Sequence, residues 1–309
     1  MKLKGTLVAN KVGKVIVFGE VLFDIFPERK CLGGAPFNFA IHLHHFGVPV
    51  CFVSRVGNDP RGKEILDFAR KSKLPTQNIQ VDPKHPTGEV RVHRSPMAGH
   101  SFEIPAHQAW DYIEWDKNTR KILDEDTSLI YFGTLAQRDP RSRETLQNIL
   151  KELPAHIPVY LDLNLRPPFY NRDILQQSLS GCNYLKANDE EVFKLKEIFN
   201  WSASDNLQSI ARKILSEYDI DILCITKGEA GSEMHRKNRE VFQTQKAGLV
   251  EHFQSSVGAG DAFSAKLVFG FLNQWKDEKL LNEASLFASQ ICTLAGAIPD
   301  NPDFYQNNG

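Results

Sequence analysis

The chain has 309 residues, with 37 Lys and Arg against 38 Asp and Glu, so its formal net charge is −1. This balance gives no field that attracts a polyanion, which disfavours a nucleic-acid platform and an electrostatic membrane anchor. The sequence shows neither a signal-peptide core at its N-terminus nor a run of about 18 apolar residues, so we expect a soluble, cytoplasmic protein that binds no membrane. The five cysteines form no CxxC pair, which indicates reduced thiols.

Short apolar runs rich in β-branched residues alternate with segments of helical spacing along the whole chain. The expected strands are residues 15–19, 50–56, 129–133, 159–163, 184–187 and 220–226. The expected helices are residues 37–46, 62–71, 141–150, 190–199, 207–218, 262–275 and 279–295. This α/β alternation predicts a mostly parallel central sheet covered by helices on both faces, within a single domain of residues 1–309.

Two segments break the alternation, at about residues 25–34 and 87–105. The second alternates polar and apolar residues around an expected turn at 97–100. Ligands of α/β proteins bind at the carboxyl ends of parallel strands, so hairpins near that edge would serve as a lid. The alternative is a surface hairpin with no role in binding.

Three other patterns match known motifs only in part. Residues 57–64 match the start of a P-loop, but Glu64 stands where a Ser or Thr hydroxyl is needed, so we interpret the segment as a strand-to-helix turn. Residues 258–260 begin a GxG whose third glycine is replaced by Phe263, which removes support for a dinucleotide-binding fold. The histidines of the HLHH run at 42–45 lack further ligands at a recognisable spacing, so we expect no metal there.

Residues 255–264 (SSVGAGDAFS) join a loop of small residues to an apolar helical segment. Gly258, Ala259 and Gly260 are small enough to expose consecutive backbone N–H groups, and the positive end of the helix dipole points to the same place. This pattern predicts an anion site. Asp261 beside it either stabilises the helix dipole or acts as general base toward a hydroxyl that attacks a phosphoryl group.

A second candidate site lies near the N-terminus. Asp24 is expected to end the first strand segment, and the paired Gly33 and Gly34 lead into Asn38 at the start of a helix. Paired glycines let a ligand approach the backbone, while Asp and Asn supply acceptors and donors for vicinal hydroxyls. The pattern predicts a sugar site, and its alternative is a glycine turn followed by an ordinary helix cap.

Polar residues also follow later strands, at the edge where ligands gather. Arg166 is suited to hold a phosphate or a ketose oxygen. Asn188 and Glu191 suit a hydrated magnesium ion or, alternatively, a helix cap. Further along the chain, Gly228 and Gly231 would let a nucleotide lie against the backbone.

Taken together, these motifs resemble the PfkB, or ribokinase-like, family of carbohydrate kinases. The resemblance rests on Gly-Gly-Ala-Pro-Phe-Asn at 33–38, Gly-Ala-Gly-Asp at 258–261 and the segments 162–166, 188–191 and 226–231 between them. It implies a three-layer α/β/α domain with a small β lid, ATP as phosphoryl donor, Mg²⁺ as cofactor and a small sugar as acceptor. Within the family the motifs look most similar to fructokinases, with 2-keto-3-deoxygluconate kinases as near neighbours.

The resemblance also implies a role for each matching residue. Asp261 becomes the catalytic base. The anion hole is formed by Gly258, Ala259 and Gly260. The sugar site contains Asp24, Gly33, Gly34, Asn38 and Arg166. The nucleotide site contains Asn188, Thr226, Gly228 and Gly231. Glu191 supports Mg²⁺ through water.

One position departs from the family pattern. The family commonly has Asp-Thr where this chain has Ser255 and Ser256. That aspartate usually helps to bind a monovalent cation, and the neutral serine puts K⁺ activation in doubt. Lys227, where the family often has leucine, is expected to add a positive charge near the nucleotide phosphates and partly offset the loss.

We therefore expect an enzyme that transfers the γ-phosphoryl group of ATP to a primary hydroxyl of a small sugar, fructose first. Arg91 and Arg94 in the lid favour an alternative, a kinase for an acidic keto sugar. An alternative from another class is a sugar-binding regulatory protein that keeps the fold without turnover, and the serines at 255 and 256 are its support. From the resemblance we also expect a homodimer formed through the lid.

Overall fold

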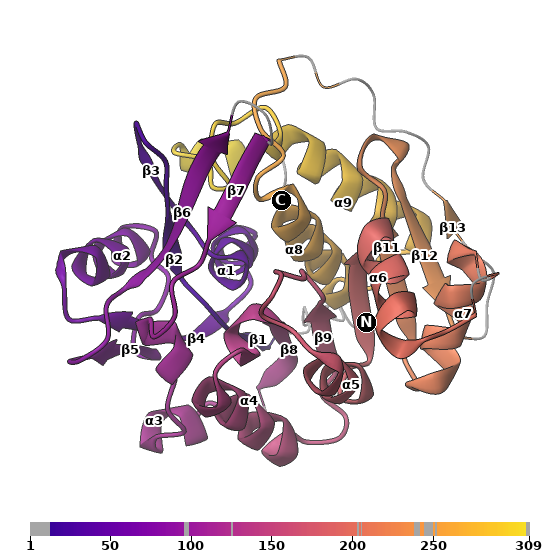
Figure 1. The fold of residues 1–309 in the computed structure, drawn as a ribbon, viewed down its shortest axis with the longest axis horizontal. Helices are drawn as coiled ribbons and strands as arrows, with labels where there is room; N and C mark the ends of the chain where they lie inside the picture. The colour runs from indigo at the N-terminus through magenta and orange to yellow at the C-terminus, as the bar shows by residue number, and fades with distance from the viewer. Residues whose placement is uncertain are drawn as a thin grey trace, which may run out of the picture.

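The computed structural model describes residues 13–95, 99–124, 126–202, 204, 206–237, 242–243, 250 and 252–306. Within these ranges the chain forms one large sheet of nine strands, a separate sheet of four strands, and helices that cover the large sheet (Figure 1). The expected α/β fold with a mostly parallel central sheet and a small additional sheet is confirmed.

The strand order of the large sheet is β13-β12-β11-β10-β9-β8-β1-β4-β5. The strands from β5 to β11 run parallel to their neighbours, and β12 and β13 add an antiparallel edge. Their bounds are β1 Lys14–Phe18, β4 Val50–Gly57, β5 Ile79–Asp82, β8 Thr127–Gly133, β9 Val159–Asp162, β10 Tyr184–Asn188, β11 Ile222–Thr226, β12 Ser232–Arg236 and β13 Phe242–Gln243.

Helices pack on both faces of this sheet, because alternate residues of its strands point to opposite sides. In β1, Val15 and Val17 belong to one core, and Ile16 and Phe18 belong to the other. The first core is covered by α1 Ala35–His45, α2 Pro60–Lys71, α8 Ala259–Leu272 and α9 Asp277–Ile291. The second core is covered by α4 Pro140–Glu152, α5 Arg172–Ser180, α6 Asp189–Phe199 and α7 Leu207–Glu217.

The small sheet has the strand order β3-β2-β6-β7, and Figure 1 shows it on the side of the molecule that carries α1 and α2. Its strands are β2 Leu22–Ile25, β3 Lys30–Gly33, β6 Gly88–Ser95 and β7 Gly99–Glu103. They fall largely within the two segments expected to form a lid, although β2 begins three residues before the expected start. The expected turn at 97–100 lies partly outside the described residues, and its last two residues belong to β7.

One expectation about this region is wrong. Asp24 does not end the first strand, because β1 stops at Phe18 and Asp24 belongs to β2 of the small sheet. The break falls at Gly19, whose φ is +152° and where a Cβ would lie 2.4 Å from Pro36 Cγ. The chain turns there because α1 packs against it, and this long-range contact has no signature in the local apolar pattern.

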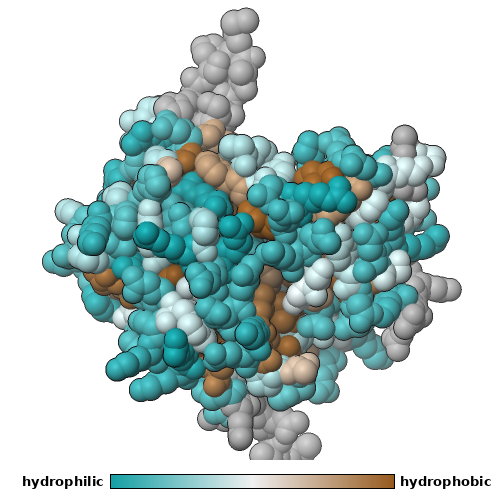
Figure 2. Space-filling view, turned by 60° about the horizontal axis from the view of Figure 1, so that its bottom comes forward, coloured by the Kyte–Doolittle hydropathy of each residue, from teal (hydrophilic) through white to brown (hydrophobic). Residues whose placement is uncertain are grey.

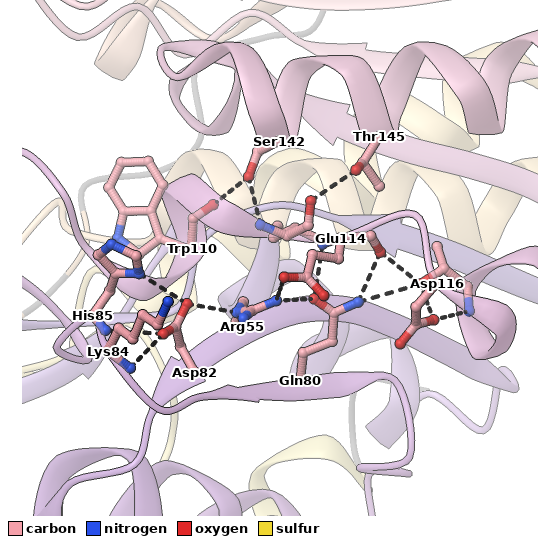
Figure 3. A network of polar contacts seen from close by, with 12 residues as sticks. Arg55, Gln80, Asp82, Lys84, His85, Trp110, Glu114, Asp116, Ser142 and Thr145 are labelled. Atoms are coloured by element: carbon pink, nitrogen blue, oxygen red, sulfur yellow. Dashed lines mark hydrogen bonds and ion pairs between the residues drawn. The ribbon is translucent and has the colours of Figure 1, made fainter.

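A polar network fixes the segment that leads from the large sheet into β6 (Figure 3). Arg55 on β4 donates through Nε to Asp82 Oδ2 on β5 at 2.8 Å. The other oxygen of Asp82 accepts the backbone N–H groups of Lys84 and His85 at 2.7 and 2.9 Å. Desolvation alone would raise the pKa of Asp82, but these hydrogen bonds and the Arg55 charge lower it to about 2. The base of the small sheet is therefore held by an ionised, fully hydrogen-bonded carboxylate.

Short elements account for most of the secondary structure that the sequence pattern does not predict. These are β5, β12, β13, α5 and the single turn α3 Lys117–Arg120. The P-loop-like segment is a strand-to-helix turn, as interpreted: Asp59 caps α2 by accepting the N–H of Gly62 at 2.8 Å.

The surface drawn in Figure 2 is mostly hydrophilic, with a narrow band of apolar residues through its middle. No helix in the described part of the chain has the length and apolar character needed to cross a membrane.

Candidate active site

The candidate residues follow the carboxyl ends of neighbouring parallel strands. Arg166 comes after β9, Asn188 ends β10 and Thr226 ends β11, and the last two are paired in the sheet register. The start of α8 brings Asp261 to residues of this edge. The order of the strands thus arranges the site along the sheet edge. The expected sugar residues lie toward β1 and β9, and the expected nucleotide residues lie toward β10 and β11.

Asp261 lies in the first turn of α8 and keeps part of its surface accessible. Its Oδ2 accepts a hydrogen bond from Asn38 Nδ2 at 2.8 Å, although the two residues are 223 positions apart. Desolvation and the nearby Asp162 carboxylate raise the pKa of Asp261 to about 7, against the effects of the Asn38 hydrogen bond, Lys186 and Arg166. A carboxylate of that pKa is suited to accept a proton near neutral pH.

The glycine loop forms the start of α8. Gly258 is its N-cap with φ of +80°, and a Cβ there would lie 2.3 Å from the Cβ of Ala297. Having no side chain, this N-cap leaves the first-turn amides without a side-chain cap. Ala259 donates its N–H to Ser256 O at 3.2 Å, so the amides best placed for an anion are those of Gly260 and Asp261.

A buried polar network lies against the glycine loop. The buried carboxylate of Asp162 accepts hydrogen bonds from Lys186 Nζ at 3.0 Å and from Ser264 Oγ at 2.8 Å. A Cβ built on Gly260 would lie 2.9 Å from Lys186 Nζ, so the ammonium group sits directly beside the loop. Burial opposes the charge of Lys186, but the neighbouring carboxylates outweigh burial and raise its pKa. A lysine inside the apolar run 184–187 was the one sequence signal for this pair.

The expected sugar residues meet around the start of α1. A Cβ on Gly33 would lie 2.9 Å from Asp24 Oδ2, and one on Gly34 would lie 2.7 Å from the carbonyl oxygen of Glu20. Gly34 also has φ of +103°, so a glycine is required there by both the backbone conformation and the close approach. Desolvation raises the pKa of Asp24 to about 6, and the charge of Arg166 opposes that rise. Arg166 itself is exposed.

Glu20 is a site residue that the sequence motifs do not indicate. It follows β1, is only 3% exposed, and its carboxyl group feels the charges of Arg166 and Asp261. It is the single charged residue in the apolar run 15–23, which was the available signal.

Asn188 and Glu191 form a capping box at the start of α6. Asn188 Oδ1 accepts the N–H of Glu191 at 2.7 Å, and Glu191 Oε2 accepts the N–H of Asn188 at 2.8 Å. The other oxygen of Glu191 accepts the N–H of Leu165 at 2.7 Å. Each carboxylate oxygen therefore holds one backbone N–H group. The contact of Glu191 with Mg²⁺ through water stays a prediction.

The expected nucleotide turn follows β11. Gly228 has φ of +54° with open space at the position of a Cβ, and Gly231 has φ of +92°. Lys227 between β11 and this turn forms an ion pair with Glu233 on β12. The expected offset by Lys227 stays a prediction, and the ion pair with Glu233 opposes it.

The described residues contain no group of three His, Cys, Asp or Glu side chains arranged to hold a metal ion. His42 is buried in the core, where its Nδ1 lies 2.8 Å from the hydroxyl of Tyr305. Burial lowers the pKa of His42 to about 3, so it is a neutral core residue.

Comparison with known proteins identifies the family. Residues 10–303 match the pfkB family of carbohydrate kinases. The chain belongs to the pfkB family of carbohydrate kinases. This pfkB kinase is 27% identical over 282 residues to an uncharacterized sugar kinase of Pyrococcus horikoshii, covering 84% of this chain and 83% of that protein. It is 24% identical over 298 residues to a fructokinase of Salmonella typhimurium, covering 90% and 91% of the two chains.

The fold of this pfkB kinase also matches solved structures. A double mutant of the fructokinase from Vibrio cholerae O395, with fructose, ADP and potassium ion bound, superposes with a TM-score of 0.73 at 18% identity. The match covers 93% of this chain and 94% of that one. The expected ribokinase-like architecture is therefore confirmed, and the chain is a carbohydrate kinase.

Proposed function

We propose that this kinase transfers the γ-phosphoryl group of ATP to a primary hydroxyl of a small neutral sugar, with fructose as the first candidate. The observation that carries the proposal is the 2.8 Å hydrogen bond between Asn38 and Asp261 at the uncapped start of α8. The bond joins the expected phosphoryl site to the segment 33–38, which we call the sugar loop. One carboxylate thereby faces both the hydroxyl to be deprotonated and the amides that bind charge.

Asp261 acts as general base in this proposal. It takes the proton of the primary hydroxyl while that oxygen forms a bond to the γ-phosphorus, and the bond from this phosphorus to the bridging oxygen of ADP breaks. The glycine loop at 258–260 and the amide of Asp261 stabilise the negative charge on the transferred group. The ammonium group of Lys186 lies directly beside Gly260, where its ion pair with Asp162 holds it in place.

The donor is ATP, held against Asn188, Thr226, Gly228 and Gly231. Mg²⁺ bound with the nucleotide supplies charge neutralisation of its phosphates. The open space at Gly228 supports close approach of a ligand to the backbone of this turn. Glu191 acts on hydrated Mg²⁺ only indirectly in this scheme, since its oxygens hold Asn188 and Leu165.

The acceptor is bound by Asp24, Gly33, Gly34, Asn38 and Arg166. Fructose as acceptor is supported by the similarity to a protein named fructokinase. It is also supported by ion pairs that offset the positive charge of an arginine in the lid. Arg91, one of the two arginines that favour an acidic sugar, is paired with Glu89 and Glu103. The side chain of Arg94 lies outside the described residues.

An acidic keto sugar is the second candidate, and the exposed Arg166 favours it. A guanidinium group binds a carboxylate through two parallel hydrogen bonds, which a neutral ketose does not offer.

The lid is also the proposed dimer interface. Phe102 on β7 is 64% exposed, and an apolar side chain so exposed on a lid strand is suited to a contact between two copies. Sedimentation of wild type and Phe102→Ser tests this: a dimer that dissociates only in the variant supports the proposal, and a monomeric wild type refutes it.

The decisive experiment is ADP release against fructose, ribose and 2-keto-3-deoxygluconate, for wild type and Asp261→Asn. We expect fructose to give the highest kcat/KM and Asp261→Asn to reduce kcat by about 10²- to 10⁴-fold. Near-wild-type turnover of Asp261→Asn would refute its role as base. Binding of sugar and ATP by wild type without ADP formation would instead support a regulatory protein without turnover.

A further inference from the structure

Glu20 carries an oxygen that has no partner in the part of the chain that the structure describes. The residue lies in the link between β1 and β2, where the chain passes from the large sheet to the lid, and it is 3% exposed. One side of its carboxyl group is stabilised by its own backbone N–H. Its Oε2 has no hydrogen-bond partner among the described residues. Buried carboxylate oxygens are normally paired, because leaving one unsatisfied costs about 1–3 kcal/mol or more.

A second unpaired acceptor belongs to the same site. Asn38 is 4% exposed and donates through Nδ2 to Asp261, but its Oδ1 has no partner among the described residues. Both unpaired atoms are acceptors of hydrogen bonds. A ligand that satisfies them must therefore bring donors, and the hydroxyl groups of a polyol are such donors.

The position of Glu20 relative to the expected acceptor follows from its neighbours. Gly34 of the sugar loop packs on the carbonyl oxygen of Glu20, and the carboxyl group interacts with the charges of Arg166 and Asp261. Arg138 also acts on Glu20, but its guanidinium group is already bound to both oxygens of Asp111. Glu20 thus lies against the sugar loop, with its carboxyl group within electrostatic range of Asp261.

The charges around Arg166 indicate the class of ligand. Glu20, Asp24 and Asp261 all interact electrostatically with this one exposed guanidinium group. Three carboxyl groups around one cation disfavour a further negative charge on the ligand. A neutral polyhydroxy compound meets the unpaired acceptors without adding to the repulsion.

We propose that Glu20 is a further acceptor-binding residue, whose Oε2 receives a hydrogen bond from a hydroxyl of the neutral polyol that Asp261 deprotonates. This inference rests on the proposed function and adds to it a residue and a preference for uncharged sugars. Burial raises the pKa of Glu20 to about 7, and Arg166 and Arg138 oppose the rise, so the group accepts the hydroxyl more strongly as the pH increases through that value.

The experiment compares wild type, Glu20→Gln and Glu20→Leu in steady-state kinetics with fructose and with ATP. We expect the KM for fructose to rise by about 10- to 100-fold in Glu20→Leu and less in Glu20→Gln, because the amide keeps one acceptor oxygen. The KM for ATP should stay unchanged. Calorimetric titration of fructose without ATP should show the same order of affinities.

Asp277→Asn is the control, since Asp277 is a partly buried carboxylate paired with Arg236, which lies opposite Ile222 at the start of β11 and so away from the strand ends that carry the site. Asp277→Asn weakens the ion pair with Arg236, so it should lower Tm and leave the KM for fructose unchanged. Glu20→Gln should not lower Tm at pH 8, because it removes a buried carboxylate with an unpaired oxygen. A structural role for Glu20 predicts the opposite pattern, a lower Tm with an unchanged KM.

A specificity readout separates the inference from the proposed function. Glu20→Gln should shift the ratio of kcat/KM for fructose to that for 2-keto-3-deoxygluconate toward the acid, by about tenfold for one lost charge-assisted interaction. If wild type phosphorylates fructose and both Glu20 variants retain its KM and its specificity ratio, the inference is overturned while the proposed function stands. If wild type phosphorylates no neutral sugar, the proposed function itself fails, and this inference with it.

Discussion

Two helices begin at the same edge of the large sheet, but they differ in whether a side chain caps the first turn. At the start of α6, Asn188 and Glu191 satisfy each other's backbone N–H groups in a capping box. At the start of α8, the N-cap is Gly258, which has no side chain to cap the first turn. Each first turn carries an acidic residue, Glu191 in α6 and Asp261 in α8. Glu191 caps its own helix, whereas Asp261 accepts a hydrogen bond from Asn38 of α1.

The difference shows what makes a helix start available to a ligand. Amides that are already hydrogen-bonded by the chain's own side chains have little left to offer an anion, whereas an uncapped turn keeps its donors and its positive dipole end. The α6 start is therefore a rigid support that also holds Leu165, and the α8 start is the place for a transferred phosphoryl group. Five experiments test this contrast.

The largest effect is expected from Gly258→Ala. The new Cβ would lie 2.3 Å from Ala297 Cβ in a backbone with φ of +80°, so the loop must move. We expect kcat to fall by about 10²- to 10³-fold, as when an anion-hole donor is lost. Gly47→Ala is the control, because Gly47 has φ of +82° and open space around it. Both variants should lose about 1–2 kcal/mol of stability in urea unfolding through backbone strain, and equal kcat values for the two would contradict the role of the loop.

The pH profile is the second test. The base must be ionised, so kcat/KM should rise with pH up to about 7, the raised pKa of Asp261, and level off above it. Asp162 raises that pKa, so Asp162→Asn should move the acid limb of the profile to lower pH. An acid limb that stays in place in this variant would mean that another group controls it.

The raised pKa also predicts a pH dependence of stability. The folded state holds a proton on Asp261 between the unfolded pKa near 4 and the folded pKa of about 7, and Glu20 behaves in the same way. The contribution of these two groups to the free energy of unfolding is therefore greatest below pH 4. It falls as the pH rises to about 7. Urea titrations of wild type and Glu20→Gln across this range should show a smaller fall in the variant.

A smaller effect is expected at the capped helix. Asn188→Ala should cost about 1 kcal/mol of stability, the usual value of an N-cap, and raise the KM for ATP only a few-fold. Asn206→Ala is the matched variant, since Asn206 caps α7 by accepting the N–H of Ser209 at 2.9 Å. It should lose the same stability with unchanged kinetics. A loss of kcat in Asn188→Ala as large as that in Gly258→Ala would erase the contrast between the two helix starts.

The smallest effect concerns potassium. Ser255 accepts the N–H of Val257 through its hydroxyl at 3.1 Å and carries no charge to attract a cation. We expect added K⁺ to change the turnover of wild type by less than about twofold, and Ser255→Asp to increase the response by restoring a negative charge. A many-fold activation of the wild type by K⁺ would refute this prediction.

Much of the framework could be predicted from the sequence because it depends on local patterns. The runs at 15–19 and 129–133 became β1 and β8, since four to eight apolar β-branched residues suit a strand buried on both faces. The start of α2 follows from Asp59 and Pro60, a cap and a first-turn proline. Asp24 was misplaced because the break at Gly19 depends on Pro36, which is distant in the sequence.

The sequence by itself determined the α/β alternation, the presence of a lid and the order of the motifs, because each depends on residues that are neighbours along the chain. Only the tertiary structure decided that Asn38 binds Asp261, that Lys186 lies beside Gly260, and that Glu20 is buried with one oxygen unpaired by any described residue. These features depend on desolvation and on contacts between distant strands, and no local pattern records them. The start of α8 thus becomes a candidate active site only when the fold brings α1, β9 and β10 to it.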